Sequence, residues 1–365
     1  MIRQTGESKI MAASNEKQQN YHEQQNRKYT MTLRGILEEL PPFVSRYFHG
    51  VEEVTSTRTR LAYAYDLRGF FHWIYEKRPD ICPVPMKELK VDVLDRIRRD
   101  DILDYLSYCT YYERDGKELS NQERAKSRKL ATIRSFYNFF FQSEMITTNP
   151  PSLVKTPKIH EKEIVRLDAN EVAILLDQVE EGEKLTKAEA NYHKLTKERD
   201  LAILTLLLGT GIRVSEFVGL NIGDIDYDND RIKVRRKGGY EAYVYFGEEV
   251  REALLSYHEK RKHIIAEKGH EEAMFLSLQK RRITVRAVEN LVKKYASRVT
   301  TMKTITPHKL RSTYGTNLYR ESGDIYLVAD VLGHKDVNTT RRHYAAIEEE
   351  RGRMASKLVH LRKED

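Results

Sequence analysis

The sequence predicts a mainly α-helical protein of two domains, with one small antiparallel β-sheet in the second. Three observations support this fold class. Apolar residues recur at steps of three and four over most of the chain, as on one face of a helix. A basic, proline-containing segment, TTNPPSLVKTPK, interrupts this pattern and is typical of an interdomain linker. Beyond it, RIKVRR and YEAYVYF alternate like strands around the glycines of KGG, which indicates a β-hairpin.

The first domain is expected to cover residues 32–157, behind an amino-terminal segment of a different character. Residues 1–31 are polar and rich in Gln and Asn, and we expect them to form a disordered arm. They contain no apolar core of a secretory signal. In the first domain, apolar periodicity predicts helices near 32–47, 57–77 and 100–112, and two more within 120–145.

The second domain is expected to cover residues 158–365. Pro150, Pro151 and Pro157 cannot continue a helix, and they favour extended backbone before them. Ten residues past the boundary, Asp168 and Glu171 have the spacing of a capping box. Further helices are expected at 171–179, 201–208, 212–220, 248–267, 285–295, 309–321, 325–332 and 339–361, with a charged surface insertion before Lys197.

Composition narrows the class of protein. Two cysteines, Cys82 and Cys109, exclude a disulfide scaffold and a cysteine-rich zinc site, and suit a reducing cytoplasm. No apolar run approaches the ~18 residues that a membrane span needs, so we expect no membrane partner. The net charge of +8 favours an anionic partner, of which nucleic acid is the common one. Charge alone leaves a generic basic enzyme equally open.

The first chemical motif is GTGIRVSE. Its two glycines let the backbone turn into a new helix, and a helix start binds anions through free amides. Arg213 lies there, and a guanidinium can contact two phosphate oxygens at once. Glu216, three residues later, shares its helix face and could orient it. No GK[ST] follows, so this is not a Walker loop, and the motif alone fits a surface arginine better.

Three later motifs add cationic groups. Lys237 is at the tip of the hairpin, where a lysine can enter a nucleic-acid groove or donate a proton, although a solvated turn lysine is the simpler alternative. His308 and Arg311 are three residues apart, so they share a helix face and suit a phosphate. His334 follows a glycine at a predicted helix end, and Tyr344 comes ten residues later, one of 22 tyrosines.

Each motif is weak alone, but their order along the chain is specific. Through TGIRVSE, RKGG, PHKLR, LGH and the terminal Tyr344, the sequence resembles the tyrosine recombinases, or phage integrase family. The resemblance spans nearly the whole chain and is greatest to Xer-type members of the single-recombinase, XerS-like kind. It implies a helical core-binding (SAM-like) domain followed by an α-rich catalytic domain. Two details depart from many members: Ser312 replaces a histidine, and the spacing between His334 and Tyr344 is one residue longer.

The resemblance implies a reaction and its catalytic residues. Tyr344 would attack a scissile phosphate of duplex DNA, form a 3′-phosphotyrosyl bond and release a 5′-hydroxyl, with no metal and no cofactor. A second DNA strand would then reverse the step. The implied catalytic residues, with Glu216 orienting a neighbour, are Arg213, Lys237, His308, Arg311, His334 and the nucleophile Tyr344.

The implied roles agree with the chemistry of the side chains. Arg213, Arg311 and His334 would stabilise charge on the phosphate oxygens, where one donor is typically worth ~10²–10³ in rate. Lys237 would protonate the leaving oxygen as a general acid, typically worth ~10²–10⁴. His308 would assist proton transfer.

The partners expected are a double-stranded DNA recombination site and further copies of the chain. Basic runs in both domains could contact the DNA backbone, or could be solvated helix faces. The candidates are Lys126, Arg128, Lys129 and Arg134 in the first domain, and Lys280, Arg281, Arg282 and Arg286 in the second. Met354, Leu358 and Leu361 form an apolar stripe that, by the resemblance, would dock on a neighbour in a tetramer on two DNA sites.

Two other functions stay open at this point. A type IB topoisomerase shares the chemistry but rejoins the same strand. A DNA-binding regulator of the same fold would lack catalysis, although here every catalytic position is filled. Among recombinases, chromosome dimer resolution and integration or excision of a mobile element are both compatible with the sequence.

Overall fold

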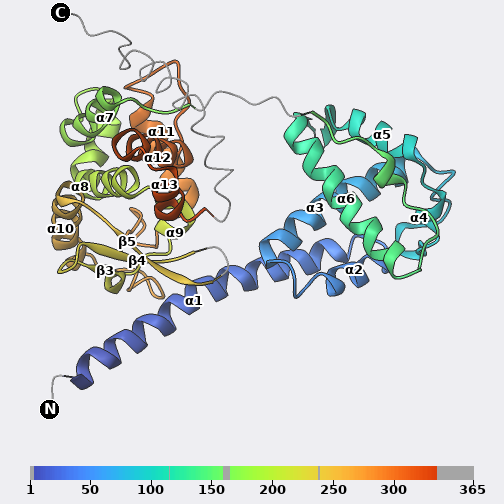
Figure 1. The fold of residues 1–365 in the computed structure, drawn as a ribbon, viewed down its shortest axis with the longest axis horizontal. Helices are drawn as coiled ribbons and strands as arrows, with labels where there is room; N and C mark the ends of the chain where they lie inside the picture. The colour runs from blue at the N-terminus through green and yellow to red at the C-terminus, as the bar shows by residue number, and fades with distance from the viewer. Residues whose placement is uncertain (1–3, 115, 159–164, 237–238, 335–365) are drawn as a thin grey trace, which may run out of the picture. The chain divides into compact units, whose positions relative to one another are not determined.

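The computed structural model describes the chain except for residues 1–3, 115, 159–164, 237–238 and 335–365 (Figure 1). The chain forms two compact units. One unit is His22–Lys162, and the other combines Met1–Tyr21 with Glu163–Asp365. The mainly helical fold class is confirmed, and no helix in the described ranges is long and apolar enough to cross a membrane.

The amino terminus differs from the prediction. Helix α1 spans Gln4–Leu37, where a disordered arm was expected over residues 1–31. The segment is polar, but its Gln, Glu and Lys residues lose little side-chain freedom in a helix, so a polar composition does not prevent helical backbone. Periodicity of apolar residues therefore missed this helix, because the helix has few apolar residues to mark a face.

The first unit is a helical domain around an aromatic core. Ser56 caps α3 (Thr57–Lys77) by accepting a hydrogen bond from the Thr59 N–H at 3.2 Å, and α3 has the bounds that the sequence predicted. A single helix, α6 (Glu123–Gln142), is found where two were expected. The hairpin formed by β1 (Tyr111–Arg114) and β2 (Lys117–Ser120) was not predicted. After α1, the elements are α2 (Val44–Gly50), α3 (Thr57–Lys77), η1 (Met86–Glu88), α4 (Val93–Arg96), α5 (Arg99–Tyr108), β1 (Tyr111–Arg114), β2 (Lys117–Ser120), α6 (Glu123–Gln142) and η2 (Pro150–Leu153).

The core of this unit is built from large rings that α2, α3 and α6 bury. Tyr47 and Phe136 lie edge to face with centroids 5.3 Å apart, and Phe136 contacts Phe140 at 5.0 Å. Phe70 packs on Tyr105 of α5 at 5.1 Å. Such rings bury large apolar areas and prefer these tilted arrangements, which accounts for most of the cohesion of a small helical domain.

The second unit is helical with one three-stranded antiparallel sheet of order β3-β4-β5. In the sheet, Ile232 pairs with Val244, and both face the core. The elements are α7 (Ala169–Glu181), α8 (Lys187–Thr210), α9 (Val214–Phe217), η3 (Ile222–Asp224), β3 (Ile225–Asp226), β4 (Arg231–Arg235), β5 (Glu241–Tyr245), α10 (Glu248–Lys262), α11 (Val285–Ala296), α12 (Pro307–Ser322) and α13 (Ile325–Leu332).

The charged insertion before Lys197, expected at the surface, forms the first part of α8 from Lys187 onward. Asp168 and Glu171 form the predicted capping box at the start of α7. A second capping box, between Thr186 and Glu189, starts α8 in the middle of the insertion. The buried stretch predicted at 201–208 is therefore the carboxyl-terminal half of one long helix, which packs against α10 and α12.

Candidate active site

The end of α13 organises the candidate active site. Gly333 adopts φ +62°, and its N–H donates to the Asp330 carbonyl at 2.8 Å. The His334 N–H donates to the Ala329 carbonyl at 2.8 Å. These two bonds form a Schellman motif, which satisfies two of the carbonyls that a helix end leaves without intrahelical partners. The motif also brings His334 to the helix end, where the sequence predicted it.

The next three carbonyls of this helix end each accept a hydrogen bond from an arginine. Arg236, Arg311 and Arg213 donate, in that order, to the carbonyl oxygens of residues 331–333. The bond from Arg236 is 3.0 Å long and that from Arg213 is 3.1 Å. Because a helix end carries partial negative charge, it attracts guanidinium groups. Three elements far apart in sequence thus place their cations at one point.

Arg213 is the N-cap residue of α9, and Glu216 orients it. The Glu216 carboxylate accepts from the Arg213 N–H at 3.0 Å and from its Nη1 at 2.8 Å. The Glu216 side chain is 4% exposed, whereas that of Arg213 is 33% exposed. A guanidinium has five N–H donors in a fixed plane, so Arg213 can bind these protein groups and still present donors to an anion from solvent.

Arg311 lies deeper and joins three helices. Its residue is 5% exposed, and its Nη1 donates to the carbonyl of Gly211 at 2.5 Å. Gly211 ends α8 with φ +60°, and a Cβ there would lie 2.4 Å from Tyr314 and 3.0 Å from Leu332. Glycine is therefore required at this position by both conformation and space. The second glycine of GTG thus brings the end of α8 against α12 and α13.

His308 is in the first turn of α12, which Pro307 opens at its first position. The residue is exposed, and it is one turn before the buried Arg311 on the same helix face. His334 is partly exposed at the end of α13. The structure therefore brings Arg213, Arg311 and His334 to one helix end, with His308 on the helix that carries Arg311.

Two catalytic candidates, Lys237 and Tyr344, lie outside the described residues. The structure does describe the ends of the β4–β5 hairpin that flank Lys237. There the Arg236 N–H donates to the Tyr240 carbonyl at 2.9 Å, and the Gly239 N–H donates to the Arg236 carbonyl at 3.0 Å. Among the residues that are described, no group of three His, Cys, Asp or Glu side chains is arranged to hold a metal ion.

The four candidate DNA-contact residues of the first unit make contacts within the fold. Asp66, which is 1% exposed, is contacted by Arg128, by Lys129 at 3.4 Å and by Thr132 at 3.0 Å. Lys129 is itself buried, whereas Arg128 is exposed.

Arg134 and Lys126 also make contacts inside this unit. Arg134 donates to the Pro151 carbonyl at 3.1 Å and to Thr156 Oγ1 at 2.9 Å, which fastens the segment after η2 to α6. Lys126, partly exposed, donates to Thr110 Oγ1 at 3.2 Å. Of the predicted DNA-contact residues in this unit, Lys129 and Arg134 thus have clear structural roles.

In the second unit, the neighbouring Arg281 and Arg282 differ in exposure and in their contacts with the fold. Arg282 donates to the carbonyls of Val218 at 3.1 Å and Leu220 at 2.8 Å, and burial lowers its pKa. Lys280 and Arg281 are exposed on the turn before it.

The remaining candidate of this unit, Arg286, is 80% exposed at the start of α11 and pairs with Glu289 at 3.3 Å. Arg282 is therefore a structural residue, and the exposed cations of this group are Lys280, Arg281 and Arg286.

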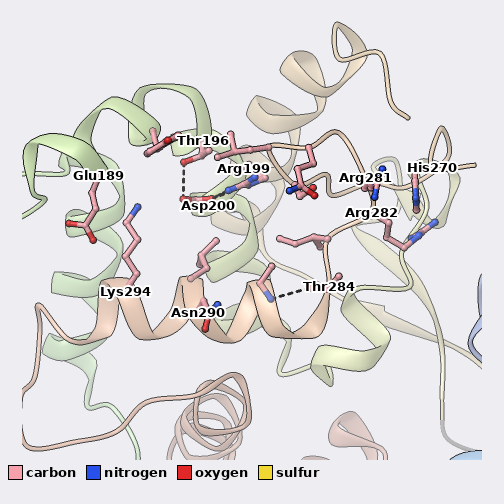
Figure 2. A pocket seen from close by; sticks show the side chains of 17 residues that line it. Glu189, Thr196, Arg199, Asp200, His270, Arg281, Arg282, Thr284, Asn290 and Lys294 are labelled. Atoms are coloured by element: carbon pink, nitrogen blue, oxygen red, sulfur yellow. Dashed lines mark hydrogen bonds and ion pairs between the residues drawn. The ribbon is translucent and has the colours of Figure 1, made fainter. Parts of the chain in front are cut away.

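A cavity of about 810 Å³ lies between α8, α11 and the 277–284 segment (Figure 2). In it, the carboxylate of Asp200 accepts from Thr196 at 3.0 Å and from Arg199 at 2.7 Å. Its lining includes neither Arg213 nor Arg311, so it is distinct from the arginine cluster at α13.

Arg236, the third arginine at the helix end, was not among the residues predicted from the sequence. It directly precedes Lys237 in the RRKGG turn, and that adjacency is the one signal the sequence offered. Alternation along β4 could not identify it, because Arg236 comes after the strand ends at Arg235.

Comparison with known proteins places this geometry in context. The Phage integrase family profile matches residues 166–351. The chain is 31% identical over 313 residues to "Tyrosine recombinase XerC" of Caldanaerobacter subterraneus subsp. tengcongensis, covering 82% of each chain. It is 31% identical over 311 residues to "Tyrosine recombinase XerD" of Staphylococcus haemolyticus, covering 85% of this chain and 93% of the relative.

Solved structures show the same fold. The Tn1549 transposon integrase in complex with a circular intermediate DNA matches with a TM-score of 0.59 at 21% identity, over 84% of this chain and 98% of that one. The XerH site-specific recombinase bound to a palindromic difH substrate matches with a TM-score of 0.60 at 16% identity, over 82% and 80%.

Proposed function

This chain belongs to the phage integrase family and is a site-specific tyrosine recombinase, an enzyme that breaks and rejoins DNA strands, and on that premise we propose which residues carry the reaction. Tyr344 is the nucleophile. Arg213, Arg311 and His334 bind the scissile phosphate, Lys237 is the general acid, and His308 assists proton transfer.

The convergence of Arg213 and Arg311 on the end of α13 is the observation that carries the proposal. Two guanidinium groups and His334 at one point suit a phosphate whose non-bridging oxygens gain charge during the reaction. The protein holds these groups before DNA arrives, so little reorganisation is needed when the charge develops. Arg213 keeps 33% of its side chain exposed, which allows it to meet the phosphate.

The steps follow from these groups. The Tyr344 oxygen attacks phosphorus, and its proton passes to a neighbouring acceptor, with His308 assisting. The bond from phosphorus to the 5′ oxygen breaks as Lys237 gives that oxygen a proton. The phosphotyrosyl bond retains the energy of the broken bond, so a 5′-hydroxyl from another strand can reverse the step without an external energy source.

The same proposal extends to DNA binding and assembly. The exposed cations Lys280, Arg281 and Arg286 contact the DNA backbone from the catalytic domain, residues 158–365, and Lys126 and Arg128 do so from the core-binding domain, residues 32–157. A homotetramer on two DNA sites, in the cytoplasm, is part of the same proposal. The tail residues expected to join its subunits lie outside the described residues.

Two biological roles are compatible with this activity. The similarity to proteins named XerC and XerD favours chromosome dimer resolution and partition. The fold matches the Tn1549 transposon integrase, with a TM-score of 0.59, about as well as it matches XerH, with 0.60. Integration or excision of a mobile element is therefore the second candidate. A type IB topoisomerase has no support among these relatives.

The test is a covalent trap. The full chain is incubated with nicked suicide DNA that carries candidate sites taken from its own genomic neighbourhood, and the products are run on a denaturing gel. A slower protein–DNA band in the wild type that is absent from Tyr344→Phe supports the proposal. A band that persists in Tyr344→Phe would assign the nucleophile to another residue. Transfer of strands between two labelled DNAs distinguishes recombination from topoisomerase-like rejoining.

A further inference from the structure

We propose that α13 of one copy of this chain docks in the groove between α8 and α11 of a second copy. The groove is the cavity of about 810 Å³ that is distinct from the arginine cluster. The inference rests on the assembly part of the proposed function, and it names two surfaces that meet in that assembly. Both surfaces belong to the same compact unit, and both consist of described residues.

The outer face of α13 presents apolar side chains to solvent. Tyr326 is 71% exposed and the adjacent Leu327 is 41% exposed, whereas Val328 and Ala329 are buried. Burying such apolar area against another molecule is favourable, and tyrosine is enriched where proteins meet because its ring is apolar and its hydroxyl can remain hydrated. This face of α13 is therefore suited to contact with protein.

The charges around this face exclude DNA as its partner. Every charged residue between positions 321 and 331 is acidic, and all three, Glu321, Asp324 and Asp330, are exposed. Asp324 caps α13 by accepting from the Tyr326 N–H at 2.8 Å, which keeps a carboxylate beside the exposed ring. Phosphates are repelled from such a face, although the whole chain has a net charge of +8. The partner must combine apolar and cationic groups.

The groove between α8 and α11 has this combination. Its lining includes the apolar Tyr192, which is 58% exposed, and Leu278, which is 54% exposed. The cations Lys294 and Arg282 lie towards opposite ends of it (Figure 2). The lining contains four arginine and lysine side chains and two carboxylates, so its net charge is opposite to that of α13.

Both carboxylates of the lining are paired with arginines. Asp200 pairs with Arg199 at 2.7 Å, and Glu189 pairs with Arg298, which is outside the lining, at 2.6 Å. Lys294 donates to the uncharged hydroxyl of Tyr295 at 3.1 Å. The positive charge of the groove is therefore available to attract the carboxylates of a partner, which favours association with α13.

The two surfaces also match in length. Helix α13 has eight residues and is about 12 Å long at ~1.5 Å per residue. The groove follows α11 from Thr284 to Lys294, which by the same rise is about 15 Å. The surfaces share no residue, so the contact between copies is heterologous, and a heterologous contact that closes produces a ring. This agrees with the proposed tetramer.

Docking at α13 would connect assembly to the active site. The carbonyls at the end of α13 accept from Arg213 and Arg311. A second copy bound along α13 contacts the helix that these proposed phosphate-binding groups hold. The interface thus gives each subunit a structural route by which the presence of its neighbour can affect cleavage.

The experiment introduces one cysteine on each surface of the full chain. Leu278→Cys places a thiol in the groove, and Leu327→Cys places one on α13. The native Cys82 and Cys109 are buried, and burial raises the pKa of the Cys82 thiol to about 11 and also raises that of Cys109, so neither competes at neutral pH. The two variants are mixed on duplex DNA that carries the candidate sites and are treated with a short bismaleimide.

We expect a cross-linked dimer from the mixture and only monomer from either variant alone. Adding Asp330→Arg to the Leu327→Cys chain should lower the yield of dimer by about 10-fold or more, because like charges across an interface oppose association. Adding the exposed Glu252→Arg of α10 instead should leave the yield unchanged. Glu252→Cys, mixed with Leu278→Cys, is the control for random cross-linking.

The other outcomes would overturn the inference in distinguishable ways. A mixture that gives no dimer, although a native gel shows several copies on one DNA, would reject these surfaces and leave the proposed function in place. Equal dimer from one variant alone would indicate a symmetric contact. A Leu327→Cys thiol that no maleimide reaches in the isolated chain would show that the chain covers its own α13. Complexes with a single copy on every DNA would reject the proposed assembly, and this inference with it.

Discussion

The carboxylate of Glu216 holds Arg213 twice, through the backbone N–H at 3.0 Å and through the guanidinium at 2.8 Å. The first bond starts α9, and the second fixes the direction of the side chain. One carboxylate thus couples the start of a helix to the orientation of a proposed phosphate-binding group.

Glu216→Gln should therefore impair cleavage more than folding. The amide keeps the shape of the side chain but loses the charge that attracts the guanidinium, so Arg213 is less well oriented. We expect single-turnover cleavage to fall by about 10-fold, less than the ~10²–10³ for complete loss of such a donor. The free energy of unfolding should fall by about 1 kcal/mol, because Arg213 is partly solvated. The exposed Glu252→Gln is the matched control, and equal rates for the two variants would contradict the orienting role.

Arg213 and Arg311 should respond differently to substitution by lysine. Arg213→Lys and Arg311→Lys should each slow cleavage by about 10²-fold or more. The ammonium group of lysine lacks the planar fork of a guanidinium, so it cannot donate hydrogen bonds in two directions from one plane. Arg311 is buried and supports the carbonyls of Gly211 and Leu332, so Arg311→Lys should also lower thermal stability by several degrees. Arg213→Lys should melt close to wild type. Cleavage kinetics and melting curves test both, and equal melting of the two variants would show that the bonds of Arg311 add little stability.

The adjacent arginines Arg281 and Arg282 allow a test of the DNA-contact proposal. Arg281 is exposed, so Arg281→Ala should weaken binding to all duplex sequences and reduce the slope of log affinity against log salt by about one. Arg282 supports the Val218 and Leu220 carbonyls, so Arg282→Ala should lower stability instead. Binding isotherms at several salt concentrations measure the first effect, and urea unfolding measures the second. The proposal for Arg281 is wrong if its variant keeps the wild-type salt slope.

The sequence predicted those elements that depend on residues close together along the chain. The helix at 57–77 was predicted from its apolar periodicity, and the capping box was predicted from the local pair Asp168 and Glu171. The β1–β2 hairpin was missed although Asp115 and Gly116 form a typical turn pair between YYER and KELS. Gly209 was expected to break a helix, but it lies inside α8, where a Cβ would meet Val250 at 2.4 Å.

Tertiary contacts explain the rest of the difference. The motif order singled out Arg213, Arg311 and His334 as candidates. Nothing local showed that Arg213 and Arg311 would donate to the carbonyls at the end of α13, because that depends on the packing of several helices. Lys129 was a candidate for DNA contact in the sequence, but in the fold it is buried and paired with Asp66. Charge runs in a sequence carry no information on which members are buried.

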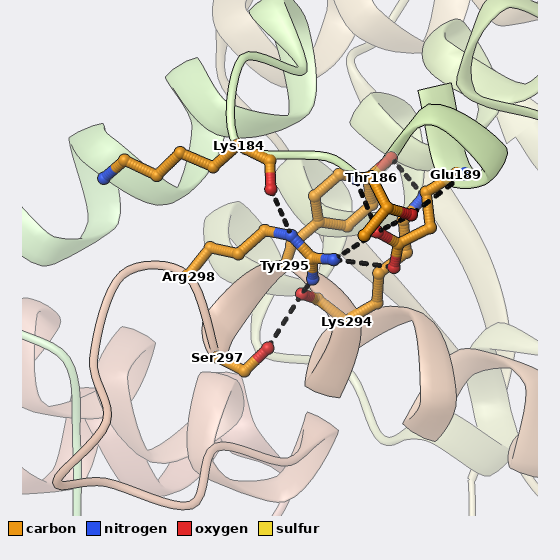
Figure 3. Close-up of polar contacts among 7 residues, drawn as sticks. All are labelled: Lys184, Thr186, Glu189, Lys294, Tyr295, Ser297 and Arg298. Atoms are coloured by element: carbon orange, nitrogen blue, oxygen red, sulfur yellow. Dashed lines mark hydrogen bonds and ion pairs between the residues drawn. The ribbon is translucent and has the colours of Figure 1, made fainter. Parts of the chain in front are cut away.

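The insertion that begins α8 should contribute stability that depends on pH. Backbone and hydroxyl hydrogen bonds from Thr186 and the ion pair with Arg298 lower the pKa of Glu189 from 4.5 to about 2 (Figure 3). Arg298 also donates to the Lys184 carbonyl at 3.1 Å, so it ties the start of α8 to the end of α11. Because the folded pKa lies below the unfolded one, the stabilisation is complete above pH 4.5 and is lost as pH falls towards 2.

Glu189→Gln should then be less stable than wild type at pH 7 by about 1 kcal/mol, a value discounted for the solvent exposure of the pair. The difference should shrink as pH falls from 4.5 towards 2, because protonation removes the charge from the wild type as well. Urea unfolding of both proteins between pH 3 and pH 7 checks this, with the exposed Glu183→Gln as the control. A deficit that stays constant across this range would mean that Glu189 acts through the shape of its capping bonds and that its charge contributes nothing.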